Sequence, residues 1–125
     1  MVWTVLVTIL FGIVAIAGSF FDRSGNFSHV IARIWAKSIL FVGRINVTVT
    51  GRFNIDPSRS YIYMSNHQSN FDIPVLLSQL KIPFRWLAKA ELFGIPLFGA
   101  AMKRAGCIRI DRSDRDSAIK SLNHA

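Results

Sequence analysis

The sequence predicts an α/β fold with a mainly parallel sheet and flanking helices, preceded by an N-terminal membrane helix or helical hairpin. After residue 44, short β-branched or aromatic runs alternate with stretches of helical length, which is the order typical of βαβ units. Before it, residues 2–21 contain no charged side chain, which is enough apolar chain to cross a bilayer as a helix. We therefore divide the chain into a membrane anchor with an interfacial helix (1–44) and the N-terminal part of an α/β domain (45–125).

The composition is both basic and apolar. Fifteen lysine and arginine residues against seven aspartate and glutamate residues give a formal net charge of +8, while the mean hydropathy is positive. This combination favours a bilayer as partner over nucleic acid, because the basic residues are scattered singly and no nucleic-acid-binding motif is present. The single cysteine, Cys107, excludes an internal disulfide and a multi-cysteine metal site. We expect no metal and no bound cofactor.

The uncharged segment at the N-terminus has two interpretations. We favour an uncleaved anchor, because no Lys or Arg precedes the apolar run and the run is long for the core of a signal peptide. The alternative is a secretory signal peptide, since Ala15-Ile16-Ala17 resembles a cleavage site. The positive-inside rule predicts that the chain after the anchor, including residues 66–72, lies on the cytoplasmic side of an inner or cytoplasmic membrane. The basic residues that follow the segment are Arg23, Arg33, Lys37 and Arg44.

Residues 27–42 form a second predicted helix. His29, Arg33 and Lys37 recur every four residues and share one polar stripe. Such a helix can lie in the headgroup layer with its cations toward anionic lipid. The alternative is an ordinary amphipathic helix that packs on the domain.

The remaining elements follow from local patterns. Alternating or β-branched runs predict strands, and Pro near the start of an apolar run is compatible with a helix. The last helix has no strand after it, so the sheet looks unfinished. The predicted strands are 45–50, 61–64, 84–88 and 106–111, and the predicted helices are 73–80, 91–104 with an irregular start, and one capped by Ser113 or Asp114.

The stretch 66–72 carries the chemistry. His67 falls in a loop between a predicted strand and a helix, and Asp72 falls near the start of that helix. A histidine accepts a proton well near neutral pH when a carboxylate holds its far ring nitrogen. A loop that turns into a helix can bring the two side chains together. The pair would then activate a hydroxyl for attack on a carbonyl.

A structural interpretation of the same two residues stays open. Asp72 can serve as a helix cap or as a first-turn carboxylate on the helix dipole. His67 can be a solvated loop histidine. The spacing by itself does not decide between these roles.

Three blocks of the sequence resemble the glycerolphosphate acyltransferase superfamily, most closely the 1-acylglycerol-3-phosphate acyltransferases. The first is Asn66-His67-x4-Asp72, which matches the catalytic motif of that family. The second, residues 89–99, is Lys-Ala-Glu-Leu-Phe-Gly-Ile-Pro-Leu-Phe-Gly. The third, residues 106–112, is Gly-Cys-Ile-Arg-Ile-Asp-Arg. Order and spacing match from about residue 60 to 122, and the three blocks are specific when taken together.

The resemblance implies transfer of an acyl group from acyl-coenzyme A or acyl carrier protein to the free hydroxyl of a lysophospholipid. His67 would be the general base and Asp72 would orient it. Arg112, Asn66 and Lys89 would bind substrate, with Arg112 on the acceptor's phosphate. From spacing alone, Arg112 could equally pair with a nearby aspartate on the surface.

The sequence departs from the family pattern in two respects. The third motif, of the Pro-Glu-Gly-Thr-Arg type, and the fourth motif are absent from these 125 residues, so we expect the chain to be the N-terminal half of an acyltransferase. Arg109 stands where the family more often has an apolar or small residue. The main alternative function is a membrane-surface binding module without chemistry.

Overall fold

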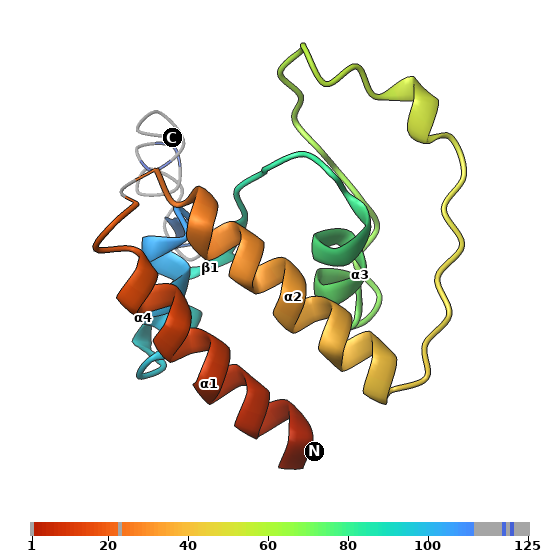
Figure 1. Ribbon diagram of the computed structural model, residues 1–125. Helices are drawn as coiled ribbons and strands as arrows, with labels where there is room; N and C mark the ends of the chain where they lie inside the picture. Colours follow the sequence, from red (N-terminus) through yellow and green to blue (C-terminus); the bar gives the residue numbers. More distant parts are fainter. Residues whose placement is uncertain (1, 23, 112–118, 120, 122–125) are drawn as a thin grey trace.

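The computed structural model describes residues 2–22, 24–111, 119 and 121. Two long helices come first, and the shorter elements follow after a long connection (Figure 1). The elements are α1 (Val2–Gly18), α2 (Asn26–Val42), the 3₁₀ helix η1 (Arg52–Asn54), α3 (Asp72–Gln79), β1 (Leu87–Lys89), the 3₁₀ helix η2 (Ala90–Gly94), α4 (Phe98–Arg104) and β2 (Ile108–Ile110).

Helices α1 and α2 lie side by side and run in opposite directions (Figure 1). The buried Ser28 hydroxyl donates to the carbonyl of Ala15 at 3.1 Å. The Trp35 indole donates to the hydroxyl of Thr8 at 3.0 Å. These contacts fix the register of a helical hairpin, and the predicted helix at 27–42 is confirmed with a start at Asn26. Among the described helices, none combines the length and the apolar character needed to cross a membrane.

The polar stripe on α2 faces the protein over much of its length. His29 is buried, with 5% of its surface exposed. The Arg33 guanidinium donates to the carbonyl of Leu80 at 3.0 Å, at the end of α3, while Lys37 is exposed. The lipid-facing orientation predicted for this stripe is therefore wrong for His29 and Arg33, because His29 packs against Phe84 and Arg33 binds the carbonyl at the end of α3. The alternative, an amphipathic helix packed on the domain, describes α2.

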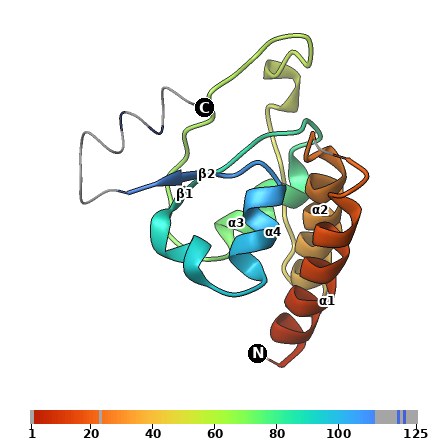
Figure 2. The same cartoon turned by 90° about the vertical axis from the view of Figure 1, so that its left-hand side faces the viewer.

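Strands β1 and β2 form a two-stranded parallel sheet, with Leu87 opposite Ile108 and Lys89 opposite Ile110. Elements η2 and α4 connect them (Figure 2). The predicted parallel pairing is confirmed, although each strand is shorter than predicted. Ile108 and Ile110 are half-buried and Arg109 is exposed, as the alternation of side chains along a strand requires.

Two further predicted strands are wrong. Residues 45–50 and 61–64 have no strand assignment and belong to the long connection between α2 and α3 (Figure 1). In the second segment Ile62 and Met64 are 91% and 93% exposed, whereas Tyr61 and Tyr63 are both 39% exposed. The exposed fractions alternate there as they do along a strand, but no described segment pairs with these residues. A stable strand needs a neighbouring strand with which to form hydrogen bonds.

The predicted helix at 73–80 is confirmed as α3. The helix at 91–104 has the expected irregular start, because it divides into η2 and α4 around Pro96 and Leu97. Leu97 adopts a positive φ of 62°, which is unusual for a residue with a Cβ atom. The helix predicted after Ser113 or Asp114 lies outside the described residues, apart from 119 and 121.

The close approach of α1 and α2 at Gly18 gives a first prediction. A Cβ atom added to Gly18 would overlap the ring of Phe27, so Gly18→Ala forces that ring out of place. We expect the free energy of unfolding to fall by about 1–3 kcal/mol, measured by urea denaturation. Gly94→Ala is the control, since no atom lies within 4 Å of the place its methyl group would occupy, and it should change stability by less than about 0.5 kcal/mol. Equal midpoints for both variants would contradict the packing.

Candidate active site

His67 and Asp72 are in direct contact. The Nδ1 atom of His67 lies 2.8 Å from Oδ2 of Asp72. An ionised carboxylate can only accept, so Nδ1–H donates and the lone pair of the neutral ring is at Nε2. The contact predicted from the spacing is confirmed, because the loop turns into α3 between the two residues.

The same carboxylate oxygen also stabilises the loop that contains His67. Asp72 Oδ2 also accepts hydrogen bonds from the backbone N–H groups of Gln68 at 2.8 Å and Ser69 at 2.9 Å. In return, the N–H of Asp72 donates to the carbonyl of Ser69 at 3.1 Å. Asp72 therefore acts as the first-turn carboxylate of α3 and as the partner of His67 at once, so the structural and the catalytic interpretations are compatible.

The carboxylate is stabilised as an anion. The Ser69 N–H, then the His67 ring and the Gln68 N–H, lower the pKa of Asp72 from its ordinary value of 3.8. The His67 side chain is 62% exposed and that of Asp72 is 32% exposed. The imidazole is therefore accessible to a substrate, and at neutral pH it faces a negative charge.

A cavity of about 300 Å³ opens beside the pair. Its polar groups come from His67, Asp72 and Ser65, and the rest of its wall is mainly apolar. The wall joins the connection before α3, α3 itself and the start of β1. The remaining lining residues are Tyr63, Met64, Ile73, Leu76, Trp86 and Leu87. Sequence reasoning missed Tyr63 and Trp86, and the only signal was their place in the predicted strands beside the motif.

Two of the other predicted substrate-binding residues, Asn66 and Lys89, are not among the described residues that line this cavity. Asn66 is exposed. Lys89 forms an ion pair with Glu91, at 2.9 Å between Nζ and Oε1, and both side chains are mostly exposed, so the pair contributes little stability. Arg112 lies outside the described residues. No group of three or more His, Cys, Asp or Glu side chains in the described part of the chain could hold a metal ion.

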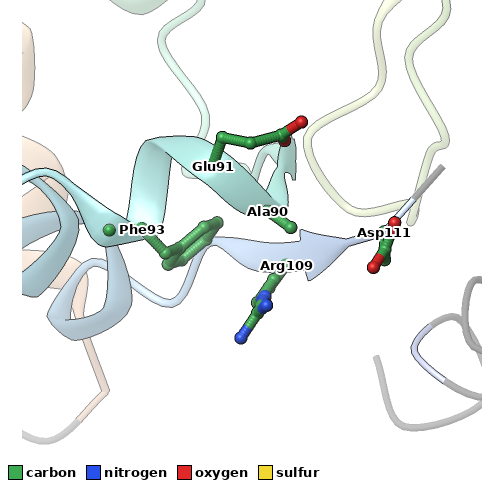
Figure 3. A pocket seen from close by; sticks show the side chains of 6 residues that line it. Ala90, Glu91, Phe93, Arg109 and Asp111 are labelled. Carbon is green, nitrogen blue, oxygen red and sulfur yellow. The ribbon is translucent and has the colours of Figure 1, made fainter. Parts of the chain in front are cut away.

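A second cavity, of about 480 Å³, lies at the other end of β1 (Figure 3). It shares no residue with the first. Arg109 extends from β2, Phe93 comes from η2, and Asp111 follows the strand (Figure 3). His67 and Asp72 are not among the residues that line this larger cavity, so the smaller one is the candidate active site.

The contact, the accessible imidazole and the largely apolar cavity together provide the geometry that a general base needs beside a bound substrate. Residues 46–125 match the protein family described as Acyltransferase, and the chain belongs to this family.

Several characterised relatives have a more specific name. The chain is 37% identical over 98 residues to the chloroplastic 1-acyl-sn-glycerol-3-phosphate acyltransferase of Arabidopsis thaliana, covering 78% of this chain and 27% of that protein. It is 30% identical to the 1-acyl-sn-glycerol-3-phosphate acyltransferase of Helicobacter pylori, covering 87% and 44%. The human alpha enzyme of the same name is 33% identical, covering 74% and 33%. The chain thus spans less than half the length of these relatives. No solved structure matches it.

The lowered pKa of Asp72 predicts acid sensitivity of the loop. Because the pKa is depressed in the folded state, the stabilisation is present above 3.8 and is lost as the pH falls through the lowered value. We expect the amide proton shifts of Gln68 and Ser69 to change together below pH 3.8 in an NMR titration. Asp72→Asn should abolish this transition.

Asp56→Asn is the matched control, because Asp56 is another exposed aspartate whose pKa is lowered by the residue two positions on, Ser58. It should leave the Gln68 and Ser69 transitions unchanged. If the Gln68 and Ser69 amides titrate in Asp72→Asn as they do in the wild type, the carboxylate of Asp72 does not hold the loop.

Proposed function

We propose that this protein is an acyltransferase that moves an acyl group from acyl-coenzyme A or acyl carrier protein to the free hydroxyl of 1-acylglycerol-3-phosphate, in phospholipid biosynthesis. The single observation that carries the proposal is the 2.8 Å contact between His67 and Asp72 beside an open cavity. Membership of the acyltransferase family and the names of the relatives support the reaction and the acceptor.

In the proposed mechanism His67 is the general base. Its Nε2 accepts the proton of the acceptor hydroxyl while that oxygen attacks the carbonyl carbon of the thioester. Asp72 holds the ring in the tautomer with the proton on Nδ1 and stabilises the imidazolium that forms. When the tetrahedral adduct collapses, the C–S bond breaks and the imidazolium returns the proton to the departing thiolate. The products are the new ester and a free thiol.

We assign the acceptor's phosphate to Arg112, with Asn66 and Lys89 as further substrate-binding residues. A guanidinium suits a phosphomonoester because its planar donors can bind two oxygens at once. Lys89 is exposed and its present partner is a surface carboxylate, an arrangement that a doubly charged phosphate can displace. This assignment rests on the motif positions of the three residues.

We further propose that the α1–α2 hairpin attaches the enzyme to the membrane that contains its substrate, on the cytoplasmic side. Helix α1 has no charged residue, and one side of it carries a row of exposed apolar side chains. A large exposed apolar surface is typical of a membrane or protein contact. The row includes Val2, Leu6, Leu10 and Ile13, which are 75%, 58%, 58% and 52% exposed.

Substitution of the proposed base tests the mechanism. His67→Ala should lower kcat by roughly 10²–10⁴-fold, which is the loss expected for a general base. Asp72→Asn should cause a loss of similar order, because an amide can hold the wrong tautomer. The measurement is acyl transfer to 1-acylglycerol-3-phosphate, with Asp56→Asn as the control that should retain full activity. A His67→Ala variant that keeps most of the activity would refute the role of His67.

Charge placed on the exposed row of α1 tests membrane attachment. The double variant Leu10→Glu/Ile13→Glu should lose most of its binding to phosphatidylglycerol-containing vesicles in a flotation assay, since both positions lie on one helical face and ionised glutamates resist burial in lipid. Phe53→Glu is the matched control. Phe53 is 90% exposed but lies in η1, away from the hairpin. Undiminished flotation of the double variant would show that another surface binds the membrane.

A further inference from the structure

His29 is a buried histidine that the proposed mechanism does not use. It lies on α2 with 5% of its surface exposed, and its Nε2 atom is buried without a hydrogen-bond partner among the described residues. Its ring packs edge-on against Phe84, with 5.2 Å between ring centroids and 77° between ring planes. This geometry is favourable for a pair of aromatic rings.

Phe84 connects His29 to the wall of the candidate active site. The Phe84 ring also packs against Trp86, with 5.2 Å between centroids, and against Tyr63, with 6.5 Å. Both Tyr63 and Trp86 line the cavity that contains His67 and Asp72. The ring of Phe84 therefore lies between His29 on α2 and the two aromatic residues of the cavity. We call these two residues, Tyr63 and Trp86, the aromatic wall.

Hydrogen bonds on both sides of His29 fix α2 against this region. Arg33 reaches the carbonyl of Leu80 at 3.0 Å. Arg85 reaches the Ser24 carbonyl at 3.0 Å and the Asn26 side chain at 2.9 Å, so it joins the residue next to Phe84 to the start of α2. Two arginines near His29 therefore attach α2 to the segment that carries Phe84 and to the end of α3.

We propose that His29 is a positioning residue whose neutral ring, packed on Phe84, holds the aromatic wall of Tyr63 and Trp86 in place beside His67 and Asp72. The catalytic consequence rests on the proposed function, but the positioning itself does not. A side chain that merely filled space in the hairpin would affect α1 and α2 without affecting the wall.

The surroundings of His29 make the positioning sensitive to acid. Burial first, and then the charges of Arg33 and Arg85, lower the pKa of His29 from 6.5 to about 4. The charged groups that act on it, Arg33 and Arg85, are both cations. The phenols of Tyr63 and Tyr61 are the other ionisable side chains in the described part of the aromatic cluster. Because the pKa of His29 is lowered in the folded state, the packing of His29 on Phe84 is fully stable above pH 6.5. It loses stability as the pH falls from 6.5 toward 4.

The variants follow from this chemistry. His29→Phe keeps an aromatic ring on Phe84 and removes an unpartnered polar atom, so it should fold at least as well as the wild type. His29→Ala removes the ring. His29→Leu fills the space without a ring and replaces His29→Ala if that variant does not fold. Val30→Ala, one residue along α2 and 49% exposed, is the control for a substitution on the same helix.

The indole N–H resonances of the purified chain in detergent micelles provide the readout. The chain has three tryptophans, and the resonance of Trp86 is identified by its loss in Trp86→Phe. Trp35, whose indole binds Thr8 within the hairpin, is the internal control. We expect His29→Ala to shift the Trp86 resonance but not the Trp35 resonance, and His29→Phe to return the Trp86 resonance to its wild-type position. In the wild type the Trp86 resonance should move as the pH falls from 6.5 to 4, and this movement should be smaller in His29→Phe.

Two outcomes would overturn the proposal. An unchanged Trp86 resonance in His29→Ala or His29→Leu would mean that the wall does not depend on His29. Equal shifts at Trp86 and Trp35 would mean that His29 only maintains the hairpin.

In the transfer assay, His29→Ala should raise KM for the acyl donor by about tenfold with little change in kcat, since the wall binds rather than reacts. His29→Phe should return KM to within about twofold of the wild type. Equal KM values in His29→Ala and the wild type would remove the catalytic consequence. A failure of the proposed reaction would instead appear as retained activity in His67→Ala, and it would leave the indole result intact.

Discussion

Helix α2 is packed on two sides, by α1 along one and by α3 along another, and the position of the candidate site depends on this arrangement. One side meets α1 through Ser28 and Trp35, which donate hydrogen bonds to it. The polar side meets the end of α3 through Arg33. Helix α3 begins at Asp72, and Arg33 binds the carbonyl at its other end. By holding α3 in place, Arg33 therefore also holds Asp72, the residue that binds His67. The hairpin is thus part of the framework of the site as well as a candidate membrane contact.

The loop from His67 to Asp72 was predictable because its determinants are local. Only four residues lie between His67 and Asp72, and two of them, Gln68 and Ser69, bind the carboxylate through their backbone N–H groups. Such a turn needs nothing from distant parts of the chain. The helices α2 and α3 and the pairing of β1 with β2 were predictable for a related reason, since apolar periodicity and the strand–helix–strand order specify them.

The failures concern partners that a local pattern does not contain. Residues 61–64 have the alternation of a strand, but alternation does not supply a neighbour with which to pair. The stripe of His29, Arg33 and Lys37 shows that α2 is amphipathic, yet it does not say whether protein or lipid covers the stripe. The carbonyl of Leu80 and the ring of Phe84, both distant in the sequence, decided that question. The aromatic wall escaped prediction because Tyr63 and Trp86 meet only through the tertiary fold.

The two histidines that the structure describes show how surroundings assign a role to the same side chain. His67 is mostly exposed and faces the anion of Asp72, so the positive charge gained with a proton is stabilised where it forms. His29 is buried and faces the cations of Arg33 and Arg85, so the same charge is opposed both by burial and by repulsion. A general base must accept a proton and release it within one turnover, and among these two only His67 has surroundings that permit it. The lowered pKa of His29 suits it instead for packing, because a ring that stays uncharged keeps its aromatic contact with Phe84 at neutral pH.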